Sequence, residues 1–423
     1  MILNKIFKSE FSKNIAFLAS SSFLTQGINF IFNVFLARIY LPEYFGTLSV
    51  FITIVGFISV LAAGKFDVAL VATTDDSDSK KLFTLSFLIL ISVSIITLIG
   101  VSIIYLLDVN IYKGQPVHDW FYFIVLSMIF ITGSQVFWML NVRDKNFKNI
   151  SYVRIAEAFT TGLLSLLLFK LAAKGLLFGT MAGQMISFIL LSVIVFRKYP
   201  LSTLKLSVKE LKETFFKYIV FPKINILQGF LDMFQMGILV LFLSKYYTPE
   251  VTGFYSQCMR VLQIPMRLLV LPVSHVFFAE ASERYRNNIS LYPLVKKTII
   301  KSFLYLLPVP LILIAFGPLI FSIAFGSVWN EAGVYARILS FWIFFELIRA
   351  PIIQIASIIG KQKQILFFAI ANAMVFTIVI FASSKSGLNV RNTLLLVSIS
   401  QVVMNIVVVL YLLKISRLKL NEH

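Results

Sequence analysis

The chain alternates between long, uninterrupted apolar runs and short polar connections. Most runs reach about 20 residues, the length that an α-helix needs to cross the hydrocarbon core of a bilayer. None shows the apolar–polar alternation of a membrane β-strand, so the runs predict membrane-spanning helices. We place about twelve of these helices, at residues 15–37, 46–66, 82–107, 120–142, 153–173, 175–196, 215–243, 251–279, 298–325, 332–358, 363–383 and 392–413.

A short phrase occurs twice, about half a chain apart: residues 40–49 read YLPEYFGTLS and residues 247–256 read YTPEVTGFYS. We interpret each copy as an interfacial turn in which Pro ends a helix, Gly permits a tight turn, and Tyr and a preceding cation anchor at the headgroup level. The residues of this repeat motif are Arg38, Tyr40, Pro42, Glu43 and Gly46 in the first copy, and Lys245, Tyr247, Pro249, Glu250 and Gly253 in the second.

Each copy follows the first predicted helix of a half, so the repeat predicts two six-helix halves that share one orientation. We therefore divide the chain into an N-terminal lobe at 1–196, a basic cytoplasmic linker at 197–214 and a C-terminal lobe at 215–423. From Ser207 onward the linker can form an amphipathic helix at the membrane surface; a plain solvated linker is the alternative. Parallel six-helix halves favour a transporter with a cleft between two lobes.

Composition and charge agree with a polytopic membrane protein. The chain is 59% hydrophobic and 13% charged, whereas a soluble domain is about 45–50% apolar and about 25% charged. Lys and Arg, which give a net charge of +19, are concentrated in alternate predicted loops, so both termini are expected in the cytoplasm. These loops also attract anionic membrane lipids. Cations scattered over many short loops argue against nucleic-acid binding.

The sequence offers little for covalent chemistry. The single Cys258 lies inside a predicted span, and the three His residues are scattered. We find no nucleophile elbow, Gly-rich phosphate loop or metal-ligand spacing. The N-terminal apolar run is too long for a cleaved signal peptide. We therefore expect no catalytic residue, no metal and no resident cofactor.

Two stretches resemble a known family of membrane transporters. Residues 35–71, FLARIYLPEYFGTLSVFITIVGFISVLAAGKFDVALV, look like the first two helices of Wzx-type polysaccharide flippases of the multidrug/oligosaccharidyl-lipid/polysaccharide exporter superfamily. Residues 253–284, GFYSQCMRVLQIPMRLLVLPVSHVFFAEASER, are similar to the eighth helix of that family. The resemblance implies two lobes in a MATE-like V around a central cavity. It also implies that basic cavity residues meet the diphosphate and acidic sugars of an undecaprenyl-diphosphate-linked oligosaccharide as it crosses the membrane.

Ionisable residues inside spans are costly and normally face a bundle interior or a wet cavity. Arg260 and Arg267 are seven residues apart in one predicted helix, so both should project from one face and could bind a diphosphate. Snorkelling is the alternative for these arginines. The principal substrate-binding candidates are Arg260, Arg267, Lys223, Asp232, Lys65 and Asp67.

Weaker candidates have an equally simple structural explanation. Arg154 and Glu157, and likewise Glu346 and Arg349, are three residues apart, a spacing that favours an ion pair within the helix. Cavity lining is the alternative for both pairs. Gln26, Asn29 and Asn33 form a polar stripe that faces the cleft or a neighbouring helix.

The first hypothesis is a flippase for undecaprenyl-diphosphate-linked oligosaccharide repeat units, serving the synthesis of capsule or of the O-antigen of lipopolysaccharide. Without an ATP motif, its energy would come from substrate flux or from an H⁺ or Na⁺ gradient.

One alternative is an ion-coupled multidrug exporter. Another is a membrane oligosaccharide polymerase or glycosyltransferase, for which Asp108 and Asp119 are the acidic candidates. We expect the bacterial cytoplasmic (inner) membrane, with a polysaccharide polymerase and its chain-length machinery as partners.

Overall fold

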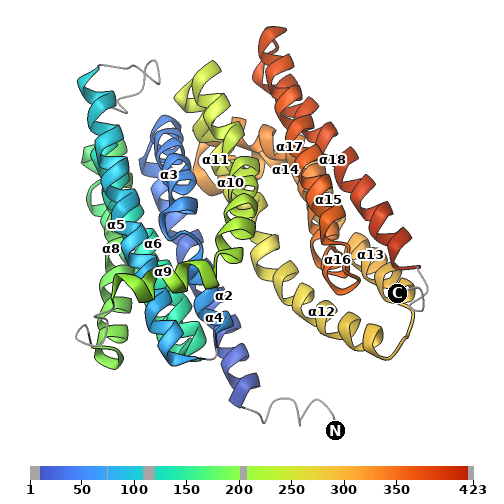
Figure 1. Cartoon of the computed structure of the whole chain (residues 1–423). Helices are drawn as coiled ribbons and strands as arrows, with labels where there is room; N and C mark the ends of the chain where they lie inside the picture. The colour runs from blue at the N-terminus through green and yellow to red at the C-terminus, as the bar shows by residue number, and fades with distance from the viewer. Residues whose placement is uncertain (1–9, 74, 108–119, 201–206, 418–423) are drawn as a thin grey trace. The chain divides into compact units, whose positions relative to one another are not determined.

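The computed structural model describes residues 10–73, 75–107, 120–200 and 207–417, and all of its regular elements there are helices (Figure 1). For some helix residues, including 10–19 and Arg267, only the backbone is described. The chain forms two compact units, residues Met1–Lys245 and Tyr246–His423, which we describe separately as unit 1 and unit 2.

In the described residues, unit 1 contains seven long helices and three short segments. Its elements are α2 (Glu10–Ile39), α3 (Pro42–Ala62), α4 (Phe66–Ala72), α5 (Asp76–Leu106), α6 (Phe121–Arg143), α7 (Phe147–Leu167), η2 (Phe169–Leu171), α8 (Ala173–Lys198), α9 (Val208–Lys217) and α10 (Val220–Tyr246).

Unit 2 is more strongly broken by prolines, and several of its helices are short. Its elements are α11 (Pro249–Leu262), the π-helix η4 (Met266–Val270), α12 (Leu271–Arg286), α13 (Tyr292–Leu306), α14 (Pro308–Phe325), η5 (Ser327–Trp329), α15 (Asn330–Ile352), α16 (Ile355–Ile358), α17 (Gln362–Lys385) and α18 (Val390–Ile415).

Ten helical segments of the described residues are long and apolar enough to cross a membrane. They correspond to ten of the predicted runs. The other two predicted runs, 15–37 and 251–279, are also helical. The first of these runs lies within α2, and a turn followed by the π-helix η4 divides the second into α11 and α12, which are 14 and 16 residues long. The prediction of an all-α polytopic membrane protein is confirmed.

The linker predicted at 197–214 is helical at both ends. Its first two residues end α8, and α9 begins after Ser207. The Ser207 hydroxyl accepts from the Glu210 N–H at 3.3 Å, and the Glu210 carboxylate accepts from the Ser207 N–H at 2.9 Å, which makes a capping box. Leu211 and Phe215 pack against the unit 1 core. The helix predicted from Ser207 is therefore confirmed, whereas its place at a membrane surface stays a prediction.

Helix α10 packs within unit 1, although the sequence division assigns it to the C-terminal lobe. The rings of Phe57 and Phe230 lie 5.6 Å apart, and a Cβ on Gly237 would meet Thr53 at 2.5 Å. The division at 197–214 is based on the sequence repeat, whereas the two units are defined by their internal contacts. The units therefore do not test the division, which stays a prediction.

The closest helix pairing in unit 1 joins α7 and α8. Gly179 and Gly183 lie one turn apart on α8, and each leaves room for the backbone or a hydroxyl of α7. A Cβ on Gly179 would lie 2.6 Å from the Ser165 nitrogen, and one on Gly183 would lie 2.9 Å from the Glu157 carbonyl oxygen. Small residues four apart allow helix backbones to approach closely within a membrane. This contact holds Glu157 against α8.

The structure corrects the interpretation of the repeated phrase. Pro42 and Pro249 do not end a helix. Each is the first residue of one, α3 and α11, where the missing N–H costs nothing and the fixed φ suits the helix. Glu43 and Glu250 lie in the first turns of these helices, where a negative charge complements the helix dipole.

The tyrosines of the phrase make hydrogen bonds inside their own units. Tyr40 is 3% exposed and donates to the Ser165 carbonyl oxygen at 2.6 Å, and Tyr247 donates to the Leu388 carbonyl oxygen at 2.9 Å. The predicted headgroup anchor therefore does not describe Tyr40. In both units the acceptor lies near the connection between the last two long helices of a predicted half, which supports the predicted duplication.

Candidate functional site

A break between α3 and α4 places a charged side chain inside unit 1. Gly64 and Lys65 have φ values of +57° and +56°, in the left-handed region. This conformation is disfavoured for a residue with a Cβ, by roughly 1–2 kcal/mol. Lys65 is held there because α4 starts at the next residue, with Phe66 buried in the core.

Three of the principal candidates meet at this break. The Lys65 ammonium lies 3.5 Å from the position that a Cβ on Gly229 of α10 would take. The Lys65 charge acts on Asp67, two residues along the chain, and on Asp232, about one turn beyond Gly229 on α10. We call Lys65, Asp67 and Asp232 the Lys65 cluster. It contains one cation and two carboxylates.

Asp67 connects the Lys65 cluster to a second polar region. Its side chain is buried at 2% exposure, and the Gln135 side chain of α6 lies beside its carboxylate. The Oδ1 atom of Asp67 has no partner among the described residues. Because a buried carboxylate oxygen without a partner is costly, this position has room for a further partner such as water or an ion.

Gln135 is exposed and also lines a half-open pocket of about 180 Å³ in unit 1, which we call the Glu157 cavity. Helices α6, α7 and α8 form its wall, with the residues Ile131, Ser134, Gln135, Trp138, Glu157, Gln184 and Ser187. The Ser187 side chain lies beside the Glu157 carboxylate. The Gln184 amide oxygen accepts from Ser127 at 2.6 Å, and the Ser134 hydroxyl has no partner among the described residues.

The ion pair expected between Arg154 and Glu157 is not closed in the described part of the chain. The Arg154 guanidinium lies over the Trp138 ring instead, 4.2 Å from the ring centroid. Such cation–π contacts are worth about 0.5–2 kcal/mol, depending on solvation. Arg154 still acts electrostatically on Glu157, and the Glu157 carboxylate is left to face the cavity.

The arginines expected to share a helix face do not lie on one continuous α-helix. Arg260 is exposed in the last turn of α11, and a turn at Gln263 precedes the π-helix that contains Arg267. Pro265 lies between them and removes a backbone hydrogen bond, so the regular seven-residue spacing does not apply. The side chain of Arg267 lies outside the described residues.

The remaining candidates are dispersed. Lys223 is exposed on α10. On α15 the Arg349 charge acts on Glu346, but the Arg349 Nε is buried without a hydrogen-bond partner among the described residues. The predicted self-satisfied pair is therefore incomplete.

On α2, which carries the predicted polar stripe, Asn29 is exposed and Gln26 is half-buried. The Asn33 Oδ1 is buried without a partner among the described atoms. Asp108 and Asp119, the enzyme candidates, lie outside the described residues. Within the described ranges no group of three or more His, Cys, Asp or Glu side chains could hold a metal ion.

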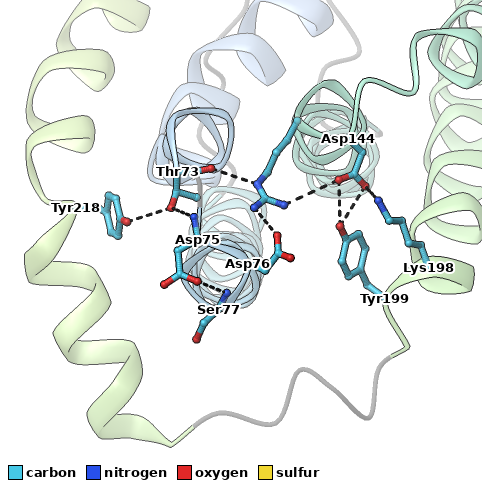
Figure 2. Close-up of polar contacts among 9 residues, drawn as sticks. Thr73, Asp75, Asp76, Ser77, Asp144, Lys198, Tyr199 and Tyr218 are labelled. Atoms are coloured by element: carbon cyan, nitrogen blue, oxygen red, sulfur yellow. Dashed lines mark hydrogen bonds and ion pairs between the residues drawn. The ribbon is translucent and has the colours of Figure 1, made fainter.

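A polar network that the sequence analysis did not single out joins the ends of four helices (Figure 2). Arg143 of α6 donates to the Thr73 carbonyl at 3.3 Å and to the Asp76 carboxylate at 2.6 Å. The neighbouring Asp144 pairs with Lys198 of α8 at 2.8 Å. The ends of α4, α5, α6 and α8 are thereby fixed to one another.

The same end of unit 1 holds α9 in place. Asp78 of α5 accepts from Lys217 at 2.5 Å and from the Tyr218 hydroxyl at 2.7 Å. The Tyr218 hydroxyl also reaches the Thr73 hydroxyl at 3.4 Å (Figure 2). The Asp78 carboxylate raises the pKa of Lys217 because it stabilises the ammonium form. The acidic run at 75–78 could have indicated this network in the sequence. Its partners Arg143, Lys217 and Tyr218 lie far along the chain, so the sequence alone does not identify them.

Comparisons with known proteins agree on the fold. The sequence profile of the family described as "Polysaccharide biosynthesis protein" matches residues 35–334. No curated protein matches the sequence of this chain significantly. Several solved structures of transporters share its fold at low sequence identity.

An inward-facing multidrug resistance MATE family transporter of the MOP superfamily has a TM-score of 0.71 at 15% identity, covering 94% of this chain and 96% of that one. The lipid II flippase MurJ, in an inward closed conformation, has a TM-score of 0.70 at 14% identity, covering 94% and 87%. A MOP superfamily transporter from Pyrococcus furiosus has a TM-score of 0.51 at 11% identity, covering 95% and 94%.

These likenesses show the fold of a MOP superfamily transporter, and the profile match covers well over half of the chain. With its apolar helices and buried polar clusters, the chain is a multi-pass membrane protein that belongs to the polysaccharide biosynthesis protein family.

Proposed function

We propose that this protein translocates an undecaprenyl-diphosphate-linked oligosaccharide across the bacterial cytoplasmic membrane by alternating access. The observation that carries the proposal is the match to a polysaccharide biosynthesis family on a chain with a transporter fold. A sugar chain and its diphosphate cannot enter hydrocarbon unaided, because each unpaired polar group costs several kcal/mol. A protein with intramembrane polar clusters lowers that barrier.

In this proposal the Lys65 cluster contacts the anionic headgroup. The Lys65 ammonium acts electrostatically on two carboxylates, Asp67 and Asp232, with no salt bridge to either in the described residues, so its charge is available to an arriving diphosphate. The left-handed backbone at Lys65 is strained, and strain of this kind is often found at binding sites and switches. In this proposal Lys65 binds the diphosphate, and the carboxylates hold Lys65 in its absence.

Orientation and partners are part of the same proposal. The loop charges favour both termini in the cytoplasm. The product enters O-antigen, capsule or a related surface glycan through a polysaccharide polymerase and its chain-length machinery.

The experiment is complementation of a deletion strain, with lipid-linked oligosaccharide measured in each leaflet. Deletion should leave complete repeat units on the inner leaflet, and the Lys65→Gln variant should restore surface glycan poorly at equal protein level. Lys170→Gln is the matched control, because Lys170 is an exposed cation of η2 away from the cluster. Export of single, unpolymerised units after deletion would indicate a polymerase, and a change in drug tolerance alone would indicate an exporter. Either result would overturn the proposal.

A further inference from the structure

We propose that α9, the helix in the linker between the two predicted halves, positions Lys65 for its ligand. Phe215 of α9 and Tyr218, which caps this helix, are the positioning residues. Both act on α4, the short helix that begins directly after Lys65. The inference rests on the proposed function and deepens it, because it names the part of the chain that determines how the diphosphate-binding ammonium is presented.

The first contact joins α9 to the residue that follows Lys65. The ring centroids of Phe66 and Phe215 lie 5.4 Å apart, a separation typical of favourable aromatic pairs. Phe66 is buried in a core cluster of unit 1, and Phe215 packs against the same cluster. Because the Phe66 side chain is held by the core and by Phe215 together, the adjoining backbone at Lys65 cannot rotate without disturbing this pair.

The second contact lies at the other end of α4. The Tyr218 hydroxyl reaches the hydroxyl of Thr73, the C-cap of α4, at 3.4 Å (Figure 2). Helix α4 has seven residues, and an isolated helix shorter than roughly 12–15 residues is marginal even with favourable composition. The position of α4 therefore depends on its tertiary contacts, and residues of the α9 segment touch it at both ends.

Lys65 needs such support because its backbone conformation is unfavourable. Its φ value is +56°, and that of the preceding Gly64 is +57°. A residue with a Cβ has a lower free energy in the right-handed region, so Lys65 would tend to return there if α4 were free to turn. A change of this dihedral redirects the side chain, and the ammonium would then leave its place beside Gly229 of α10.

The segment that supports α4 continues into the helix beside the Lys65 ammonium. Helix α10 begins at Val220, two residues after Tyr218. It contains Gly229, from whose Cβ position the Lys65 ammonium lies 3.5 Å away. It also contains Asp232, on which the Lys65 charge acts. One continuous stretch of chain therefore contacts both α4 and the side chain of Lys65.

This stretch is fastened to unit 1 at Asp78 of α5. The buried Asp78 carboxylate accepts from the Lys217 ammonium and from the Tyr218 hydroxyl. Since most of α9 lies in the linker between the predicted halves, a change in the linker is transmitted through this attachment to α4 and Lys65. The ammonium can thereby be presented or withdrawn without any change in the ligand.

Amine labelling of the full chain in nanodiscs tests the positioning directly. The rate of labelling at Lys65, which is half-buried, is measured by mass spectrometry, with the exposed Lys170 as the reference in the same sample. Phe215→Ala should accelerate labelling of Lys65 several-fold, because the released side chain becomes accessible. The matched control is Phe216→Ala, which removes the neighbouring ring of the same helix, 62% exposed, and should leave the rate unchanged.

Tyr218→Phe is a second, milder variant, which loses only a hydroxyl. It should also accelerate labelling of Lys65, by less than Phe215→Ala. It decides the question if Phe215→Ala does not fold. Phe215→Tyr keeps the ring that contacts Phe66 and should label at the rate of the unsubstituted protein.

Binding of radiolabelled undecaprenyl diphosphate then distinguishes positioning from simple stabilisation. Phe215→Ala should weaken binding by about tenfold, the equivalent of ~1.4 kcal/mol. Lys65→Gln should weaken it too, and the double variant should bind as Lys65→Gln does, because Phe215 acts through the ammonium. A helix that merely stabilises the fold would give losses that add.

The inference is overturned if neither α9 variant changes the labelling of Lys65, if Phe216→Ala has the same effect as Phe215→Ala, or if the losses in affinity add. If undecaprenyl diphosphate binds through Lys65 while the labelling ignores α9, the inference falls and the proposed function stands. If the labelling responds as expected and the protein neither binds undecaprenyl diphosphate nor moves lipid-linked oligosaccharide, the proposed function falls and the positioning of Lys65 by α9 stands.

Discussion

The Tyr40 hydroxyl donates a 2.6 Å hydrogen bond to the carbonyl oxygen of Ser165, at the end of a helix far along the chain. Tyr247, at the same position of the repeated phrase, makes the corresponding bond to Leu388 and lies 2.9 Å from the Thr393 hydroxyl. A motif that looks like a surface turn in the sequence therefore fastens the connection after the first predicted helix of each half to the connection between the last two long helices of that half.

Removal of either hydroxyl should destabilise the protein. Tyr40→Phe leaves the Ser165 carbonyl without its partner at a buried site, and we expect a loss of about 1 kcal/mol. Tyr247→Phe should lose a similar amount or less, because Tyr247 is less buried. Thermal unfolding in detergent measures both. Free-energy changes at distant sites usually add, so the double variant should lose the sum of the two single losses in stability. A much larger loss of stability would indicate that the two hydrogen bonds are coupled.

The contact between α7 and α8 should tolerate no added side chain at Gly183. Gly183→Ala would place its Cβ against the Thr161 hydroxyl and the Glu157 carbonyl oxygen, and we expect the helices to separate at a cost of about 1–3 kcal/mol. The matched control is Gly27→Ala on α2, where nothing lies within 4 Å of the new Cβ. That control should be neutral or stabilising, by up to about 1 kcal/mol. Equal melting temperatures for both variants would contradict the close approach.

Two substitutions of Lys65 distinguish the cost of its left-handed backbone from the role of its charge. Lys65→Gly removes the penalty of the left-handed conformation, whereas Lys65→Ala keeps it, so the Gly variant should be the more stable by about 1 kcal/mol. Both lose the ammonium and should be equally poor in surface glycan synthesis. Melting temperature and glycan level are measured on the same membranes. If the Gly variant restored glycan, the Lys65 charge would not be needed.

The attachment of α9 should depend on Asp78. Asp78→Asn weakens the bonds from Lys217 and Tyr218, and α9 should then open more often. Trypsin cleavage after Lys209 or Lys212 would report this as a several-fold faster reaction. Glu213→Gln is the control, because Glu213 is exposed on the same helix. Unchanged cleavage of the Asp78→Asn protein would show that the apolar contacts of α9 suffice to hold it.

The sequence by itself determined the helices and the class of the protein. Long apolar runs must become helices in lipid whatever their neighbours do, so ten predicted runs appear as long apolar helices in the described residues. Local chemistry also sufficed for α9, where Ser207 and Glu210 cap one another within a single turn. The repeated phrase was visible as a pattern, although its tyrosine bonds were not.

Tertiary structure decided which charged groups meet. Spacing within one helix suggested that Arg154 pairs with Glu157, yet Trp138 from another helix holds the guanidinium. Lys65 and Asp232 are far apart in sequence and interact only because α10 passes the break after α3. The period of a helix gives the face on which a side chain lies. The partner that it meets on that face depends on how separate helices pack, and the local sequence contains no information about those contacts.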